Sequence, residues 1–187
     1  MKSEETKYSV ESRIIPVADY IRGYRDAERI GGYCRQCGNY GRLWSCPPFD
    51  FDVDAAISKW RNVLIVACRI EIPKGINGMA ELRDVRRKLE RKLLDLEASV
   101  GGLAFGFSGE CLHCQACSRP SGIICRHPES VRPALEAYGF DVCRTISDLF
   151  RFSLEWSADG SIPRHLTLVG ALFHNADPDN ESFNQIW

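Results

Sequence analysis

Apolar residues recur with a helical period between Gly78 and about Val100, and this is the clearest pattern in the chain. Spacings of three and four residues place such positions in one stripe on one side of an α-helix. The outer positions carry Arg, Lys and Glu of mixed sign, which favours a solvated face over a nucleic-acid surface. We therefore expect a long helix that covers a sheet with the stripe Met79, Leu82, Val85, Leu89, Leu93 and Leu96.

Four segments have the composition of β-strands. Residues 62–72 are dense in β-branched side chains, and residues 103–109 follow the Gly101-Gly102 pair that ends the long helix. Residues 151–156 and 164–173 predict two further strands, joined by a hairpin-length connection that contains Asp-Gly and Pro. These segments predict a sheet of four to five strands.

Shorter helices are expected around this sheet. The first thirty residues are interpreted as helical, a short helix is expected to start at an Asp cap near Asp52, and another should end at Gly139. The order of elements predicts an α+β fold over residues 1–187: a single open sheet of four to five strands covered by helices, packed largely on one face. The apolar positions of the first segment are Val17, Ile21, Tyr24 and Ile30.

Composition and charge narrow the class of protein. Of the 187 residues, 44% are hydrophobic and 26% charged, which is ordinary for a soluble globular protein. The formal net charge of −1 gives no attraction toward nucleic acid or an anionic membrane. The N-terminal segment lacks the apolar core of a signal peptide, and the apolar runs are too short to span a bilayer. We expect a cytoplasmic protein that binds neither nucleic acid nor membrane.

The nine cysteines are clustered and odd in number. A disulfide scaffold suits a short secreted chain, whereas ligands two residues apart suit a metal. Seven cysteines fall in two loops, at 32–50 and 109–130. A long loop within a compact domain needs a source of order, and a bound metal would supply it.

The loop at 109–130 carries a complete local set of four thiols, which we call the second cysteine set. Three cysteines in a C-x2-C-x2-C run present three thiolates from one tight turn, as in bacterial ferredoxins. The fourth follows after seven residues that include Pro and Gly, which can turn the chain back to the same cluster. Zinc usually takes paired knuckles, so the spacing favours a [4Fe–4S] cluster. The set consists of Cys111, Cys114, Cys117 and Cys125.

Basic side chains close to the second cysteine set could offset the negative charge of a bound cluster. They are Arg119, Arg126, Arg132 and protonated His127, and Arg119 is equally well interpreted as a surface residue. His113 lies inside the first C-x2-C pair, but with four thiols available it is interpreted as a bystander.

The loop at 32–50 carries only three thiols, Cys34, Cys37 and Cys46, which we call the first cysteine set. A fourth ligand must come from elsewhere in the chain, from solvent or from a substrate. Cys125 is one candidate; Cys68 and Cys143 lie in apolar, strand-like surroundings and are interpreted as core residues. This set could hold a second cluster, a zinc ion or a metal with an open coordination position. Tyr33, Tyr40 and Trp44 could wall a small pocket there or be part of the core.

The motif "YCRQCGNYGRLWSCPP", followed by "CLHCQAC" and "CRHPESVRPALEAYGFDV", resembles the prokaryotic family named domain of unknown function 2284, whose members are predicted metal-binding proteins. The resemblance runs from roughly Gly32 to Val142 and implies that the seven cysteines of the two sets bind metal. The family usually has serine after the Arg-Pro pair, where this chain has Ala134, so a catalytic hydroxyl is not expected there. The resemblance brings no known reaction with it.

Three functions remain open on these residues. The first is an iron–sulfur protein that passes electrons to or from a redox partner protein. The second is an enzyme or metallochaperone that uses an open metal position at the first cysteine set. The third is a structural zinc protein. No nucleotide or flavin fingerprint is present, and the catalytic residues, if any, are not identified by the sequence.

Overall fold

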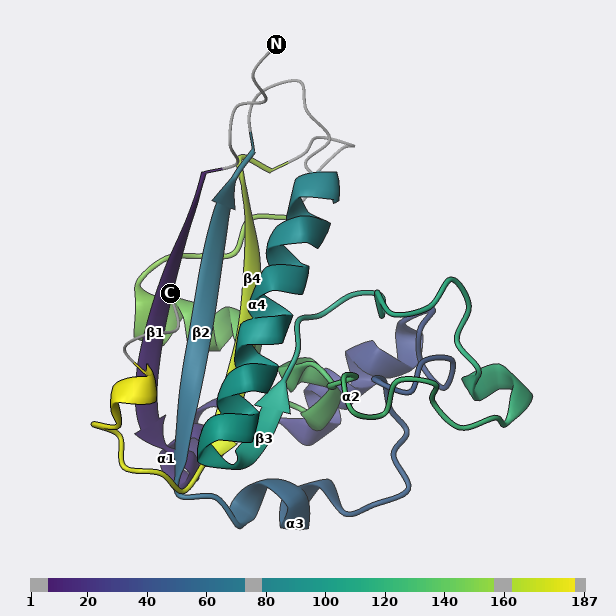
Figure 1. Ribbon diagram of the computed structural model, residues 1–187, viewed down its shortest axis with the longest axis horizontal. Helices are drawn as coiled ribbons and strands as arrows, with labels where there is room; N and C mark the ends of the chain where they lie inside the picture. The colour runs from purple at the N-terminus through teal and green to yellow at the C-terminus, as the bar shows by residue number, and fades with distance from the viewer. Residues whose placement is uncertain (1–6, 73–78, 157–162, 184–187) are drawn as a thin grey trace.

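Among the residues that the structure describes, the sheet has four strands and every neighbouring pair is antiparallel (Figure 1). The computed structural model describes residues 7–72, 79–156 and 163–183. In this part of the chain the strand order is β1-β2-β4-β3. The α+β class and the open sheet are therefore confirmed. The strands are β1 (Tyr8–Pro16), β2 (Asn62–Glu71), β3 (Gly102–Phe105) and β4 (His165–His174).

The two longest strand pairings place β2 and β4 at the centre of the sheet. Ile65 is paired with Ala171 across β2 and β4, and with Arg13 across β2 and β1. Because β2 and β3 are each antiparallel to β4, they run in the same direction, with β4 between them. The long helix between β2 and β3 therefore makes the crossover of a split β-α-β unit.

Five α-helices and three short 3₁₀ turns surround the sheet in the described residues. Aspartate side chains cap three of the helices: Asp26, Asp52 and Asp141 each accept a hydrogen bond from a backbone N–H in the first turn. The cap expected at Asp52 is thus confirmed. The elements are α1 (Val17–Tyr24), α2 (Ala27–Gln36), α3 (Val53–Ser58), α4 (Met79–Val100), α5 (Val142–Phe150), η1 (Arg119–Ser121), η2 (Leu135–Tyr138) and η3 (Glu181–Phe183).

Helices cover both faces of the sheet, so the expectation of one covered face is wrong. Side chains alternate along β2, and Leu64 and Val66 pack with α4 while Val63 and Ile65 pack with α1 and α5. A strand buried on both faces is continuously apolar, as β2 is. The stripe of α4 is confirmed: Val85, Leu89, Leu93 and Leu96 are buried and Leu82 is partly buried, while the side chain of Met79 is outside the described part.

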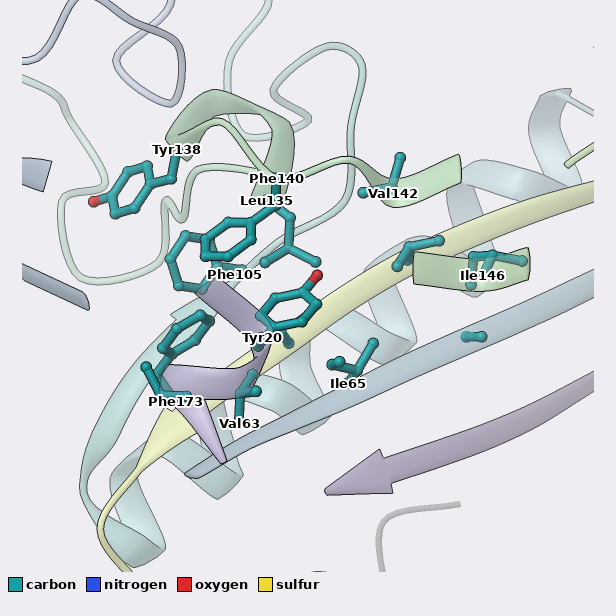
Figure 2. Packing of buried hydrophobic residues seen from close by; sticks show 14 of the residues in the cluster. Tyr20, Val63, Ile65, Phe105, Leu135, Tyr138, Phe140, Val142, Ile146 and Phe173 are labelled. Carbon is teal, nitrogen blue, oxygen red and sulfur yellow. The ribbon is translucent and has the colours of Figure 1, made fainter. Parts of the chain in front are cut away.

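An aromatic cluster fastens η2 to the face of the sheet opposite α4 (Figure 2). The rings of Tyr20 and Phe140 stack at 4.6 Å, and the rings of Phe105 and Tyr138 meet edge-on at 4.8 Å. Phe173 of β4 lies beside Phe105, with ring centroids 5.0 Å apart. Aromatic pairs of this kind contribute about 0.5–1.5 kcal/mol beyond their buried area. The cluster fixes η2, and with it the following residues, relative to the sheet.

The expectation that the first thirty residues are helical is wrong for β1. Residues 8–16 pair along the whole of β2, and Val10 and Ile14 pack on the α4 face of the sheet. These two residues belong to a short alternating pattern. The apolar residues that follow, from Val17 to Tyr24, have helical spacing, and the helix prediction was wrongly extended back over the strand. Helices α1 and α2 account for the remainder of the segment.

Three expectations between residues 130 and 163 also change. The helix expected to end at Gly139 is only the one-turn η2, because Pro133 disfavours helical backbone in the residue before it. Gly139 does end that turn, with φ 86°. Residues 151–156 form no strand, and the helix α5 before them was not expected. The predicted hairpin connection lies largely at 157–162, outside the described residues.

In the described part of the chain, none of the helices combines the length and the apolar character that crossing a bilayer requires.

Candidate metal centre

The two cysteine loops lie together beside the sheet, where the chain leaves β3 and α2 ends (Figure 1). Cys34 lies in the last turn of α2 and Cys37 is the residue that caps its end. The loop then folds through short backbone hydrogen bonds, from the amide of Cys46 to Leu43 O (3.1 Å) and from Gly41 N to Pro47 O (2.8 Å). These bonds hold the first cysteine set in a compact turn.

Arg119 joins the second loop to the first. Its guanidinium donates to Leu43 O at 2.7 Å and also to the carbonyls of Cys46 and Pro48. The same group lies 5.2 Å from the ring centre of Trp44, a cation–π contact. All of these partners belong to the first loop. Arg119 therefore connects the two loops, a role that the sequence did not predict, and its charge lowers the pKa of Cys46.

Trp44 makes the reciprocal connection from the first loop to the second. Its Nε1 donates to Ile123 O at 3.1 Å and to Ser118 Oγ at 3.3 Å. Ser118 is buried, and its hydroxyl donates to Ile124 O at 2.8 Å. Trp44 also lines the cavity formed by the second cysteine set. Hydrogen bonds thus hold the two loops together as one unit, which we call the cysteine lobe (residues 34–50 and 109–130).

All four thiols of the second cysteine set line one cavity of about 180 Å³, which we call the second cavity. The four groups also lie close enough to influence one another: burial raises the pKa of the Cys111 thiol, and the other three thiols raise it further. Backbone N–H groups point at two of the sulfurs, from His127 to Cys125 Sγ at 3.4 Å and from His113 to Cys111. The sequence placed these four residues in one set, and the structure brings them together.

The three thiols of the first cysteine set line a neighbouring cavity, also about 180 Å³, which we call the first cavity. Burial raises the pKa of Cys46, and the thiols of Cys37 and Cys34 raise it further. Cys111 lines both cavities, as do Asn39 and His113. The two cysteine sets therefore adjoin through a common wall.

Glu136 is a residue of the first cavity that the sequence did not identify. Its Oε2 atom is buried and has no hydrogen-bond partner among the described residues. Burial raises the pKa of this carboxyl group, while hydrogen bonds from its own backbone and from the Ser108 side chain lower it. The Cys34 thiol donates to the backbone carbonyl of Glu136 at 3.7 Å. The available signal was a lone acidic residue between Leu135 and Ala137 in an otherwise apolar turn.

The two cysteines outside the sets lie elsewhere. Cys68 is fully buried in β2 on the face covered by α4, and burial raises its pKa to about 12, so its assignment to the core is confirmed. Cys143 is exposed in the first turn of α5, so its assignment to the core is wrong. The apolar residues around Cys143 belong to the amphipathic helix α5, and Cys143 lies on the exposed side of that helix. Neither residue lines either cavity.

The basic residues near the second cysteine set have different partners. Arg132 forms an ion pair with Glu97, with Nε 3.0 Å from Oε2. His127 Nδ1 lies 4.0 Å from a Glu129 carboxylate oxygen. Arg126 lines the second cavity, beside the four thiols. His113 also lines this cavity, and its ring lies 5.6 Å from that of His127.

The donor atoms surround the cavities rather than converge. Among the residues that the structure describes, no three His, Cys, Asp or Glu side chains stand close enough to hold a metal ion in their present orientations. All nine cysteines are free thiols. The donor chemistry fits a thiophilic metal or cluster, since four sulfurs enclose one cavity and three enclose the next. Ligation requires the thiol groups to turn toward the centre of each cavity.

Comparison with known proteins gives one match. The model of a family described as "Predicted metal-binding protein (DUF2284)" matches residues 21–173, which include all seven cysteines of the two sets. No curated protein and no solved structure matches the chain.

Proposed function

The chain belongs to the DUF2284 family of predicted metal-binding proteins, and we propose that it is an iron–sulfur protein that exchanges electrons with a protein partner. The observation that carries this proposal is the second cavity, which four thiols line within one short loop. Four thiolates are the ligand set of a [4Fe–4S] cluster, and a closed set suits outer-sphere electron transfer. When bound, the cluster would supply a one-electron redox centre.

The surroundings of the second cysteine set favour a redox role. N–H groups that point at cluster sulfurs stabilise the more negative, reduced state and raise the reduction potential. His127 N–H is directed at Cys125 Sγ, and Arg126 adds a positive charge at the same cavity. These residues of the chain would tune a bound cluster without ligating it.

A partner would approach the cluster at the tip of the second loop. Ile123 and Ile124 have exposed fractions of 56% and 79%, which is unusual for isoleucine, and they directly precede the ligand Cys125. Exposed apolar residues beside a redox centre allow close, short-lived docking. Ile124→Glu should therefore slow electron transfer to a partner and leave the cluster spectrum unchanged.

The proposal is tested by anaerobic purification, followed by a visible spectrum, electron paramagnetic resonance of the reduced protein, and iron and sulfide analysis. We expect a broad absorption in the blue-violet with matched iron and sulfide. Cys114→Ser should remove this signal at the second cysteine set, whereas Cys143→Ser, a substitution of an exposed cysteine outside both cavities, should retain it. Colourless protein that contains zinc would refute the iron–sulfur assignment and support a structural metal.

A second candidate is an enzyme or metallochaperone that uses the first cavity. The cavity is lined in part by apolar residues of α4 and β3, such as Leu93 and Phe105, and also by the three thiols. Three thiolates leave one coordination position for a small molecule. If so, cyanide or a small thiol should perturb the spectrum of the centre at the first cysteine set alone, and the effect should vanish in Cys46→Ser. A spectrum that such ligands do not change would argue for two closed centres.

A further inference from the structure

The buried Oε2 atom of Glu136 lies in the wall of the first cavity without a hydrogen-bond partner among the described residues. An unpaired carboxylate oxygen is costly to bury, by roughly 1–3 kcal/mol even when the group is neutral. Buried polar atoms without partners are rare in folded proteins, and an ion that binds at the site is one physical reason for them. The first cavity therefore contains an oxygen donor that lacks a partner next to a thiol set that lacks a fourth ligand.

The neighbouring arginine side chains bind other carboxylates rather than the Glu136 Oε2 atom. Arg86 also lines the first cavity, but its Nε donates to Glu90 at 2.7 Å and its Nη1 donates to Ser108 O at 3.1 Å. Arg132 is bound to Glu97. Both guanidinium groups are thus committed to other carboxylates, and a metal ion would be the positive charge next to Glu136.

The contact between α2 and η2 holds Glu136 beside the first cysteine set. Cys34 Sγ lies 3.7 Å from Glu136 O, and the Glu136 carboxyl group is among the charges that raise the pKa of Cys34. The three cysteines that the sequence offered as a fourth ligand of the first cysteine set do not line the first cavity. Cys125 lines the second cavity, and Cys68, which is buried in β2 beneath α4, and Cys143 line neither cavity.

We propose that the Glu136 carboxylate is the fourth protein ligand of the metal centre held by the first cysteine set. This proposal rests on the proposed function only in that this set binds a metal. Carboxylate oxygen completes thiolate sites for zinc and for other divalent metals. With Glu136 bound, the first site is closed by the protein, and two closed centres on either side of Cys111 form a relay.

Cobalt(II) is the probe, because its visible spectrum reports the number of thiolates that bind it. The full chain, stripped of metal and reduced, is titrated with cobalt(II), and each variant is compared with the parent protein by difference spectra, so that the second cysteine set contributes equally to both. Glu136→Cys should increase the thiolate-to-cobalt absorption of the first site by about one third, since four thiolates then replace three. Glu136→Gln should weaken binding at this site by about tenfold or more.

Thermal unfolding separates a ligand from a structural residue. Without metal, Glu136→Gln should be at least as stable as the parent protein, because it replaces a buried acidic group, one oxygen of which has no partner among the described residues, with a neutral amide. With cobalt(II), the variant should gain less stability than the parent, because its site binds the metal less tightly. Glu90→Gln is the matched control: it changes a glutamate of the same cavity that is paired with Arg86, and it should keep the cobalt spectrum.

The possible results have different consequences. A Glu136→Gln protein with the parent's cobalt spectrum and the parent's metal-dependent stability would overturn the assignment of Glu136 and leave the metal site standing. Lower stability of the metal-free variant with unchanged cobalt affinity would assign a structural role instead. If the parent protein shows no thiolate-to-cobalt absorption at all, the metal-binding premise fails, and the iron and sulfide analysis decides separately on the second set.

Discussion

Replacing Arg119 by alanine should loosen the cysteine lobe without unfolding the sheet. The side chain is half-buried and donates to three backbone carbonyls of the first loop. Hydrogen bonds to charged groups are worth about 1.5–3 kcal/mol each, and partial exposure lowers that, so we take about 1 kcal/mol for each of the three. Arg119→Ala should therefore destabilise the closed form of the lobe by about 3 kcal/mol, a factor of about one hundred in the opening equilibrium.

Hydrogen exchange followed by mass spectrometry measures this effect locally. Peptides that contain the amides of Gly41 and Cys46 should exchange about one hundred times faster in Arg119→Ala, while peptides from β2 should be unchanged. Arg119→Lys keeps the charge but not the forked geometry, so it should recover only part of the protection. Arg126→Ala, at an exposed neighbouring arginine, is the control. Less than a threefold change in Arg119→Ala would refute this role of Arg119.

Three further predictions concern single positions. Gly139→Ala should lower the free energy of unfolding by about 1–3 kcal/mol in urea, because the residue has φ 86° and a Cβ would lie 2.7 Å from an α2 backbone atom; Gly122→Ala, with φ 68° and open space, should cost less. Burial lowers the pKa of His174, so the unfolded chain binds more protons below its pKa of about 6.5; stability should fall as the pH drops below that value, and His174→Phe should remove the dependence. In the metal-loaded protein, iodoacetamide should label Cys143 and spare Cys68, as counted by intact mass, and additional labels would contradict metal ligation of the two sets.

The parts of the fold that the sequence predicted are those with a strong local pattern. The β-branched run of β2 and the six-residue stripe of α4 each carry their period within one segment. The strand β1 was missed because its alternation is short and its pairing partners lie 46 to 62 residues away in the chain, from Pro16↔Asn62 to Tyr8↔Ile70. Residues 151–156 have strand composition but pack as an irregular segment, with Phe152 and Leu154 against the aromatic side of the core. Composition alone does not distinguish a strand from such a segment.

In the candidate site, too, local patterns predicted some features and long-range contacts were missed. The spacing of the cysteines predicted which thiols gather, because ligands within one loop depend on local turns. Arg119 and Glu136 were not assigned their places, because their partners lie 76 and 102 residues away in the chain. The Glu136 contact depends on how α2 and η2 pack, and the Arg119 contacts depend on how η1 lies against the first loop, neither of which a local pattern encodes. The contacts of these two residues are therefore visible only in the folded structure.

The way the lobe is held together bears on the choice among the three functions. In a small zinc module the metal supplies the order, and the chain unfolds without it. Here the sheet has apolar clusters on both faces, and the cysteine loops are bound to each other by Arg119 and Trp44. Contacts within the chain therefore contribute to the order of these loops, and a metal would add to it. The proposed electron-transfer function accounts for two adjoining thiol-lined cavities that share Cys111, since centres bound there would be joined by a short path.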